Sequence, residues 1–160
     1  MVGRGLTLAA VVVLLDQLSK WWVLRLLLPR APHERMIEFT PFFNLVLVSN
    51  RGVSFGLFND GNEATNALIF TAIAAVIVVC LVVWLTRTRD ALLTVAIGLV
   101  IGGAIGNVID RLRLGWVVDF LDFHAAGWHW PAFNVADSAI VVGVGLMLLD
   151  GLRGRQETTS

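Results

Sequence analysis

The chain has 160 residues, of which 57% are hydrophobic and only 15% are charged. A soluble domain carries about 45–50% apolar and about 25% charged residues, so this composition excludes both a water-soluble globule and a disordered chain. Basic and acidic side chains number 12 each, and a net charge of zero gives no electrostatic field that would favour nucleic acid as a partner. The sequence therefore predicts one integral membrane domain over residues 1–160.

Four apolar segments are long enough to cross a bilayer, since a spanning helix needs about 20 mostly apolar residues. They cover residues 6–28, 64–85, 91–109 and 132–149. An even number of spans puts both termini on one side of the membrane. The segments on the side of the termini hold as many arginines as the two long segments opposite, in about a third of the residues. This density predicts cytoplasmic termini.

The two long segments, residues 29–63 and 110–131, are then expected on the outer side. The first contains FFNLVLVSNRGVSFGLF (42–58), which is rich in β-branched and aromatic residues and predicts two short strands around a turn at Gly52. The second contains Trp116, Trp128 and Trp130, and tryptophan favours the headgroup level. The predicted fold is an all-α membrane protein, a four-transmembrane-helix bundle with a small extracytoplasmic β-like platform.

Several residues are unusual for spanning helices. Asp16 and Lys20 are four residues apart with the acid first, the favourable order for an ion pair on one helix face, and such a structural pair explains them as well as a functional site does. Gly98, Gly102 and Gly106 recur every four residues in the third span. A smooth stripe of this kind is typical of close helix–helix packing, which we favour over ligand binding.

Further polar residues gather at the ends of the third and fourth spans. Asn107, Asp110 and Arg111 share one helix face, and Asp110 and Arg111 are close enough to neutralise each other. Asn134 and Asp137 share a face at the start of the fourth span. Because Asp137 lies about one turn inside the membrane and no basic residue follows it for most of that helix, we interpret it as functional.

A second acid, Asp119, has apolar neighbours in WVVDFLDF (116–123), just before the fourth span. Two carboxylates that approach closely cannot both ionise easily, so one can take a proton from water while the other donates one to a scissile carbonyl. This is the arrangement of aspartic proteases. No serine-hydrolase motif is present, and the histidines lack metal-ligand spacing, so we expect neither a metal nor a cofactor.

Two other classes of protein fit some of these features. Four spans with buried acids also suit a proton- or cation-coupled small membrane transporter, although the acids here cluster at one membrane face. The glycine stripe alone would suit a packing subunit of a larger membrane complex.

Five motifs in order along the whole chain resemble the lipoprotein signal peptidases (signal peptidase II). They are DQLSK (16–20), NRGVSFG (50–56), GGAIGNVIDR (102–111), VVDF (117–120) and FNVADSAI (133–140). The resemblance implies an aspartyl peptidase of the bacterial inner membrane. Such an enzyme cuts diacylglyceryl-modified prolipoproteins before the lipidated cysteine, at the outer membrane face. Members of the family often have a small uncharged residue in place of Arg51.

The resemblance also implies roles for particular residues. The catalytic pair falls on Asp119 and Asp137, and Asp110 is a rival for the first position; we favour Asp119 because Arg111 would hold Asp110 ionised. Supporting or substrate-binding roles fall on Asp16, Lys20, Asn50, Gly52, Asn107, Asp110, Arg111 and Asn134. The implied partners are prolipoproteins and membrane lipid, with no nucleic acid, and we expect a monomer.

Overall fold

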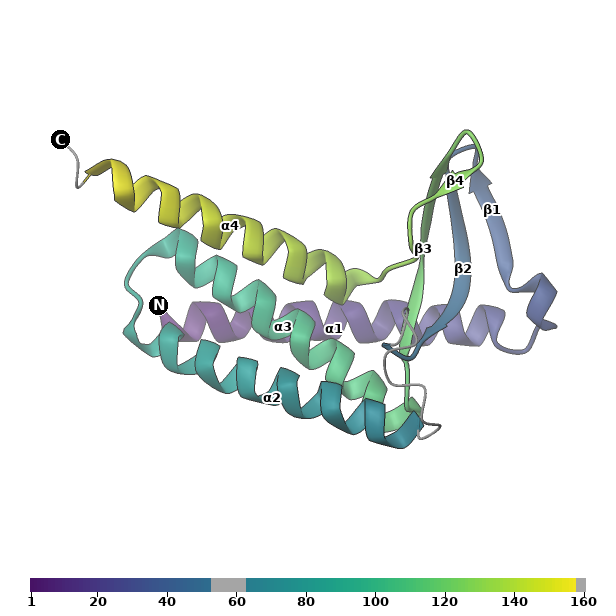
Figure 1. The fold of residues 1–160 in the computed structure, drawn as a ribbon, viewed down its shortest axis with the longest axis horizontal. Helices are drawn as coiled ribbons and strands as arrows, with labels where there is room; N and C mark the ends of the chain where they lie inside the picture. The colour runs from purple at the N-terminus through teal and green to yellow at the C-terminus, as the bar shows by residue number, and fades with distance from the viewer. Residues whose placement is uncertain (53–62, 158–160) are drawn as a thin grey trace.

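A computed structural model of the protein describes residues 1–52 and 63–157. Within them, the helices are α1 (Val2–Leu27), η1 (Pro32–Glu34), α2 (Glu63–Arg87), α3 (Ala91–Leu114) and α4 (Val135–Glu157). The strands are β1 (Met36–Thr40), β2 (Phe43–Asn50), β3 (Val117–Ala125) and β4 (Trp128–His129). The helices form a bundle, and the strands form a sheet at one end of it (Figure 1).

Four of the described helices, α1 to α4, are long and apolar enough to cross a membrane, as the sequence predicts. Several boundaries differ from the predicted ones, and two of these differences concern the polar residues at the ends of the third and fourth spans. Helix α3 continues to Leu114 rather than ending near residue 109, so that Asp110 and Arg111 belong to its last turns, and α4 begins at Val135 rather than near residue 132. The start of α1 and the end of α4 both lie at the end of the bundle away from the sheet (Figure 1).

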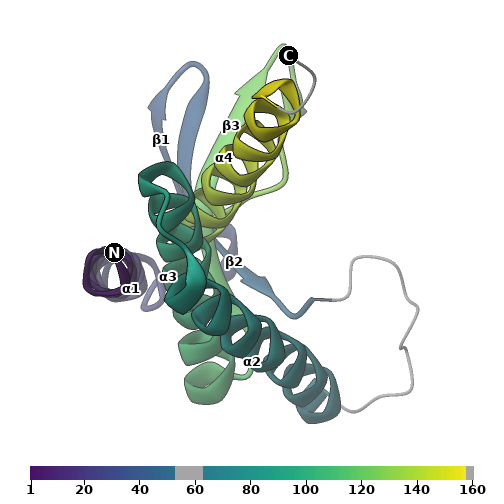
Figure 2. The ribbon, with the colours of Figure 1, turned by 90° about the vertical axis from the view of Figure 1, so that its left-hand side faces the viewer.

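Helix α3 is the centre of the bundle and packs against the other three spanning helices (Figure 2). A Cβ added to Gly98 or Gly102 would lie 2.7 Å from a backbone oxygen of α1, from Gly5 or Ala9 respectively. These positions admit only glycine, because a Cβ so close to backbone would force the two helices apart. The prediction that the glycine stripe serves helix packing is confirmed.

The sheet has the order β1-β2-β3-β4, and every neighbouring pair is antiparallel. The predicted strand in residues 42–58 is present as β2, while residues 53–58, where the second strand was expected, lie outside the described residues. The neighbours of β2 are β1 and β3. Strand β3 was not predicted. Its first four side chains, Val117 to Phe120, are all buried, so they do not show the alternation of apolar and polar residues that marks a half-buried strand.

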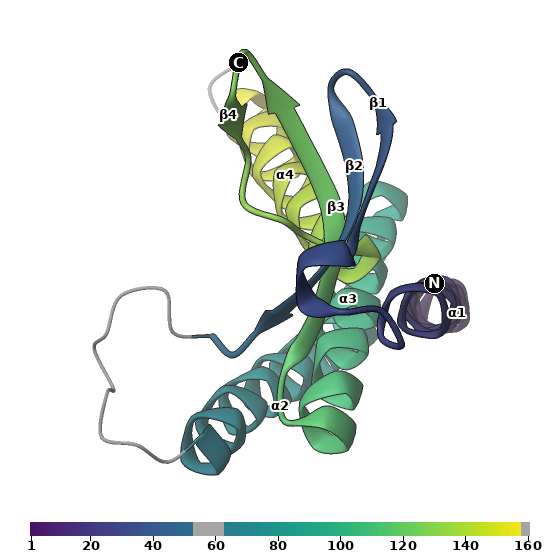
Figure 3. The same cartoon turned by 90° about the vertical axis from the view of Figure 1, so that its right-hand side faces the viewer.

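The base of the sheet packs on the C-terminal end of α1. Val23 and Leu27 of α1 form a buried cluster with Leu45 of β2 and with Val118 and Phe120 of β3. These contacts hold β3 against the helix ends, so the side chain of Asp119 is placed beside the start of α4. Seen from the sheet end, β2 and β3 cross over the ends of the helices (Figure 3).

Candidate active site

The two acids that the sequence singles out are joined by one side chain, that of Asn134. Its Nδ2 donates to Oδ1 of Asp119 over 2.7 Å, while its Oδ1 accepts the backbone N–H of Asp137 over 2.9 Å. In return, Oδ2 of Asp137 accepts the backbone N–H of Asn134 over 3.2 Å. This reciprocal pair caps the first turn of α4. Asn134 therefore fixes Asp137 and Asp119 relative to each other.

Two further asparagines donate to the same carboxylates, and the orientation of each amide is set by its other partner. Oδ1 of Asn50 accepts the backbone N–H of Gly52 over 2.8 Å, so its Nδ2 faces Oδ2 of Asp119 at 2.9 Å. Oδ1 of Asn107 accepts a hydrogen bond from Lys20 over 3.0 Å, so its Nδ2 faces Oδ1 of Asp137 at 2.8 Å. Both acids are thus held by amide donors.

The environment of Asp119 favours its protonated form. Burial, together with the negative charge of Asp137, raises the pKa of this carboxyl to about 6, against the lowering effect of the hydrogen bonds from Asn50 and Asn134. A carboxyl group with a pKa in this range can carry a proton close to neutral pH. One acid that holds a proton beside a second acid is the arrangement that general acid–base catalysis requires.

Lys20 is buried and lies between two acids. Its Nζ is 2.9 Å from Oδ2 of Asp16 and 2.8 Å from Oδ2 of Asp110. The predicted ion pair of Asp16 with Lys20 is therefore confirmed. The other oxygen of Asp16 accepts the backbone N–H of Ala136 over 2.9 Å and so ties α1 to the first turn of α4. A Cβ on Gly106 would lie 2.6 Å from Oδ2 of Asp16, so the glycine stripe ends where this ion pair begins.

The cation in direct contact with Asp110 is Lys20 rather than its sequence neighbour Arg111. Oδ2 of Asp110 also accepts the backbone N–H of Val118 over 3.1 Å, which positions the residue next to Asp119. The guanidinium of Arg111 instead lies over the ring of Phe70, 5.5 Å from its centroid. Its charge acts on Asp137 and, less strongly, on Asp110 and Asp119.

Gly52 also has a conformational role, since it adopts a φ of +79° in the turn that follows β2. A Cβ there would lie 2.6 Å from the ring of Phe70. Phe70, which packs against both Gly52 and Arg111, was not identified from the sequence, because an apolar residue in an apolar span carries no signal.

Gln17 is a second site residue that sequence reasoning missed. Its Nε2 donates to Oδ1 of Asp110 over 3.0 Å and to Oδ2 of Asp16 over 3.2 Å. The sequence feature that could have identified Gln17 is its position inside the DQLSK motif, between Asp16 and Lys20. All the predicted supporting residues belong to this connected set: Asp16, Lys20, Asn50, Gly52, Asn107, Asp110, Arg111 and Asn134.

The sequence model of one protein family, described as signal peptidase (SPase) II, matches residues 8–153. The chain belongs to the signal peptidase II family. Proteins named lipoprotein signal peptidase from Burkholderia thailandensis and Burkholderia mallei are each 46% identical to it over 149 residues, which cover 92% of this chain and 87% of the relative. The membership makes this protein a peptidase with several membrane spans.

Two solved structures are similar to the whole signal peptidase II fold described above. Both are titled as bacterial membrane enzyme structures. One has a TM-score of 0.78 at 30% identity and covers 97% of this chain and 91% of the solved one. The other has a TM-score of 0.76 at 32% identity and covers 94% and 93% respectively. These likenesses favour the peptidase over the transporter and the packing subunit considered from sequence.

Proposed function

We propose that this signal peptidase is an aspartic endopeptidase that removes the signal peptide from diacylglyceryl-modified prolipoproteins, cutting before the lipidated cysteine. The family membership and the relatives named lipoprotein signal peptidase support the substrate class. The observation that carries the mechanism is the bridge by which Asn134 holds Asp119 and Asp137 together. The catalytic pair is Asp119 and Asp137.

In this mechanism Asp119 carries the proton of the pair at the start of the reaction, and Asp137 is ionised. Asp137 takes a proton from a water molecule, whose oxygen attacks the carbonyl carbon of the scissile bond, while Asp119 gives its proton to the carbonyl oxygen. The tetrahedral intermediate collapses as Asp137 passes its proton to the leaving nitrogen and the C–N bond breaks. Asp119 recovers a proton from the intermediate, so both acids return to their starting states.

Three contacts support Asp119 over Asp110 as the first acid. The carboxylate of Asp110 is ion-paired with Lys20 and accepts hydrogen bonds from Gln17 and from the backbone N–H of Val118. With these partners, Asp110 positions its neighbours and does not transfer a proton. The carboxylate of Asp119 instead accepts hydrogen bonds from the side-chain amides of Asn50 and Asn134, and the charge of Asp137 acts on it. Arg111 contributes charge rather than proton transfer, because its guanidinium stays protonated in proteins.

The test is cleavage of a synthetic diacylglyceryl-modified precursor by purified protein in detergent. Asp119→Asn and Asp137→Asn should each lower kcat by about 10²–10⁴-fold, and the double variant should be little worse than either, because the two acids act as a unit. Asp110→Asn is the control and should lose less activity. The assignment fails if Asp119→Asn keeps substantial turnover while Asp110→Asn is inactive and folded.

We further propose that the enzyme is a monomer in the bacterial cytoplasmic membrane, with the sheet on the outer side and both termini in the cytoplasm. The arginine density near the termini supports this orientation. In a Cys80→Ser background, an impermeant thiol reagent applied to intact cells should label Glu38→Cys at the sheet and spare Thr88→Cys between α2 and α3. Labelling of Thr88→Cys alone would reverse the topology.

A further inference from the structure

Helix α2 supplies an aromatic ring to the candidate site. Phe70, near the start of this helix, lies against Gly52 and Arg111. A Cβ on Gly52 would be 2.6 Å from a carbon of the ring, and the guanidinium carbon of Arg111 is 5.5 Å from the ring centroid. Phe70 therefore packs against the turn after β2 and against the last turns of α3 at once.

The ring is the main contact that can orient the side chain of Arg111. In the described part of the chain, the guanidinium donates one hydrogen bond, from Nη1 to the backbone oxygen of Asn107 over 3.4 Å. This bond is weak, because N–H···O bonds in proteins usually have donor–acceptor distances of about 2.7–3.2 Å. A guanidinium over an aromatic face is attracted by the negative face of the ring. The half-buried arginine is thus held in place by Phe70.

The place of Arg111 matters because its charge acts on the catalytic pair, and most strongly on Asp137. The other charged groups around the start of α4 belong to α1, α3 and β3, and they are Asp16, Lys20, Asp110 and Asp119. Lys20 is already ion-paired with two of these acids. A nearby positive charge favours the ionised form of a carboxyl group. Arg111 can therefore supply that charge to Asp137.

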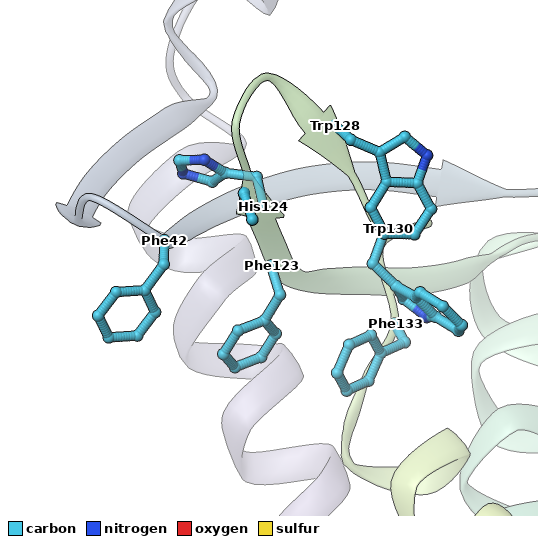
Figure 4. Close-up of a pocket in the computed structure, with 7 residues that line it drawn as sticks. Phe42, Phe123, His124, Trp128, Trp130 and Phe133 are labelled. Carbon is cyan, nitrogen blue, oxygen red and sulfur yellow. The ribbon is translucent and has the colours of Figure 1, made fainter.

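Other aromatic rings, next to β3, pack on one another. The rings of Phe123 and Phe133 stack with their centroids 5.9 Å apart. Together with Phe42, Trp128 and Trp130 they line an open apolar pocket of about 420 Å³ on the sheet (Figure 4). The ring of Phe70 differs from these, because it belongs to a spanning helix and has a charged group over its face. Its neighbours indicate an electrostatic role in addition to packing.

We propose that Phe70 is a positioning residue, whose ring holds the guanidinium of Arg111 beside the catalytic pair so that the positive charge favours the ionised form of Asp137. This inference rests on the proposed function, in which Asp137 must be ionised to take a proton from water. Phe70 itself transfers no proton and acts through Arg111.

The test is the pH profile of kcat/KM for cleavage of the diacylglyceryl-modified precursor by purified variants in detergent. Phe70→Leu keeps an apolar side chain but removes the ring, so fewer molecules have Arg111 beside Asp137. The acidic limb should move to higher pH, and kcat/KM on that limb should fall by about 2- to 30-fold, which corresponds to the strength of a cation–π contact. Phe70→Met, a second variant without the ring, should behave alike, whereas Phe70→Tyr keeps the ring and should restore the wild-type profile.

Trp21→Leu is the matched control. The guanidinium carbon of Arg25 is also 5.5 Å from the ring centroid of Trp21, but this pair lies on the exposed surface of α1 and its loss should leave the profile unchanged. In an Arg111→Ala background, Phe70→Leu should cause no further shift, because the ring acts through the arginine. A Phe70→Leu profile that coincides with the wild type, or an equal loss with and without Arg111, would overturn the proposal.

A second measurement does not depend on activity. Protons held over an aromatic ring resonate upfield, so the Nε–H proton of Arg111 in NMR spectra of arginine-labelled protein should move downfield in Phe70→Leu and return in Phe70→Tyr. Arg111→Lys identifies the signal. An unmoved resonance would overturn the positioning role while leaving the proposed function intact. A wild-type protein that leaves the precursor uncut would overturn the proposed function, and the positioning role with it.

Discussion

The hydrogen bond from Asn50 to Asp119 allows the role of each acid to be separated by pH. In Asn50→Ala, Oδ2 of Asp119 loses a 2.9 Å bond that stabilises its ionised form. A hydrogen bond to a charged group contributes about 1.5–3 kcal/mol, and one pKa unit corresponds to about 1.4 kcal/mol. Because Asn50 is exposed and water can replace part of the bond, we expect the pKa of Asp119 to rise from about 6 by roughly one unit.

The sign of the effect on activity follows from the role of Asp119. If the protonated form donates to the substrate carbonyl, kcat/KM falls as pH rises through this pKa. The basic limb of the pH profile should then move up by roughly one unit in Asn50→Ala. The assay is the initial rate of precursor cleavage below KM from pH 5 to 10. An upward shift of the acidic limb alone would make Asp119 the general base, and unmoved limbs would refute the coupling.

The same change predicts a shift in stability. The folded-state pKa of Asp119 already lies above its ordinary value of 3.8, so the folded state binds more protons than the unfolded state between about pH 4 and 6. The free energy of unfolding therefore falls as pH rises through that window, and in Asn50→Ala the fall continues to higher pH. Asn44→Ala is the matched control, since Asn44 makes an equal 2.9 Å bond to Asp122 and should leave the activity profile unchanged.

Two further changes test the packing of the site by thermal denaturation in detergent and by cleavage rate. Gly106→Ala should lower stability by about 1–3 kcal/mol and reduce cleavage, because its Cβ would displace the carboxylate of Asp16, whereas Gly145→Ala has open space around it and should change neither. Lys20→Met should destabilise the protein by about 3–5 kcal/mol, since it leaves the buried carboxylates of Asp16 and Asp110 without their cation. A Lys20→Met variant with the same melting temperature as the wild type would contradict the account of this ion pair.

Features that depend on one continuous stretch of chain could be predicted from the sequence. The four spans follow from the length of the apolar runs. Helix α1, for example, is determined by its own apolar stretch and does not depend on which elements pack against it. The ion pair of Asp16 with Lys20 is set by their spacing of four residues on one helix. The glycine stripe was correctly assigned to packing because α3 places every fourth residue on nearly the same face.

Features that join distant parts of the chain were decided by the tertiary structure. The partner of Asp110 is Lys20 rather than its sequence neighbour Arg111, because α1 and α3 pack so closely at the glycines that a lysine side chain can bridge them. Strand β3 exists because β2 supplies its hydrogen bonds, and the bond from Asn50 to Asp119 forms only across that pairing. Local spacing determines which side chains share a face of one element, but the distance between two elements depends on how all their side chains pack together.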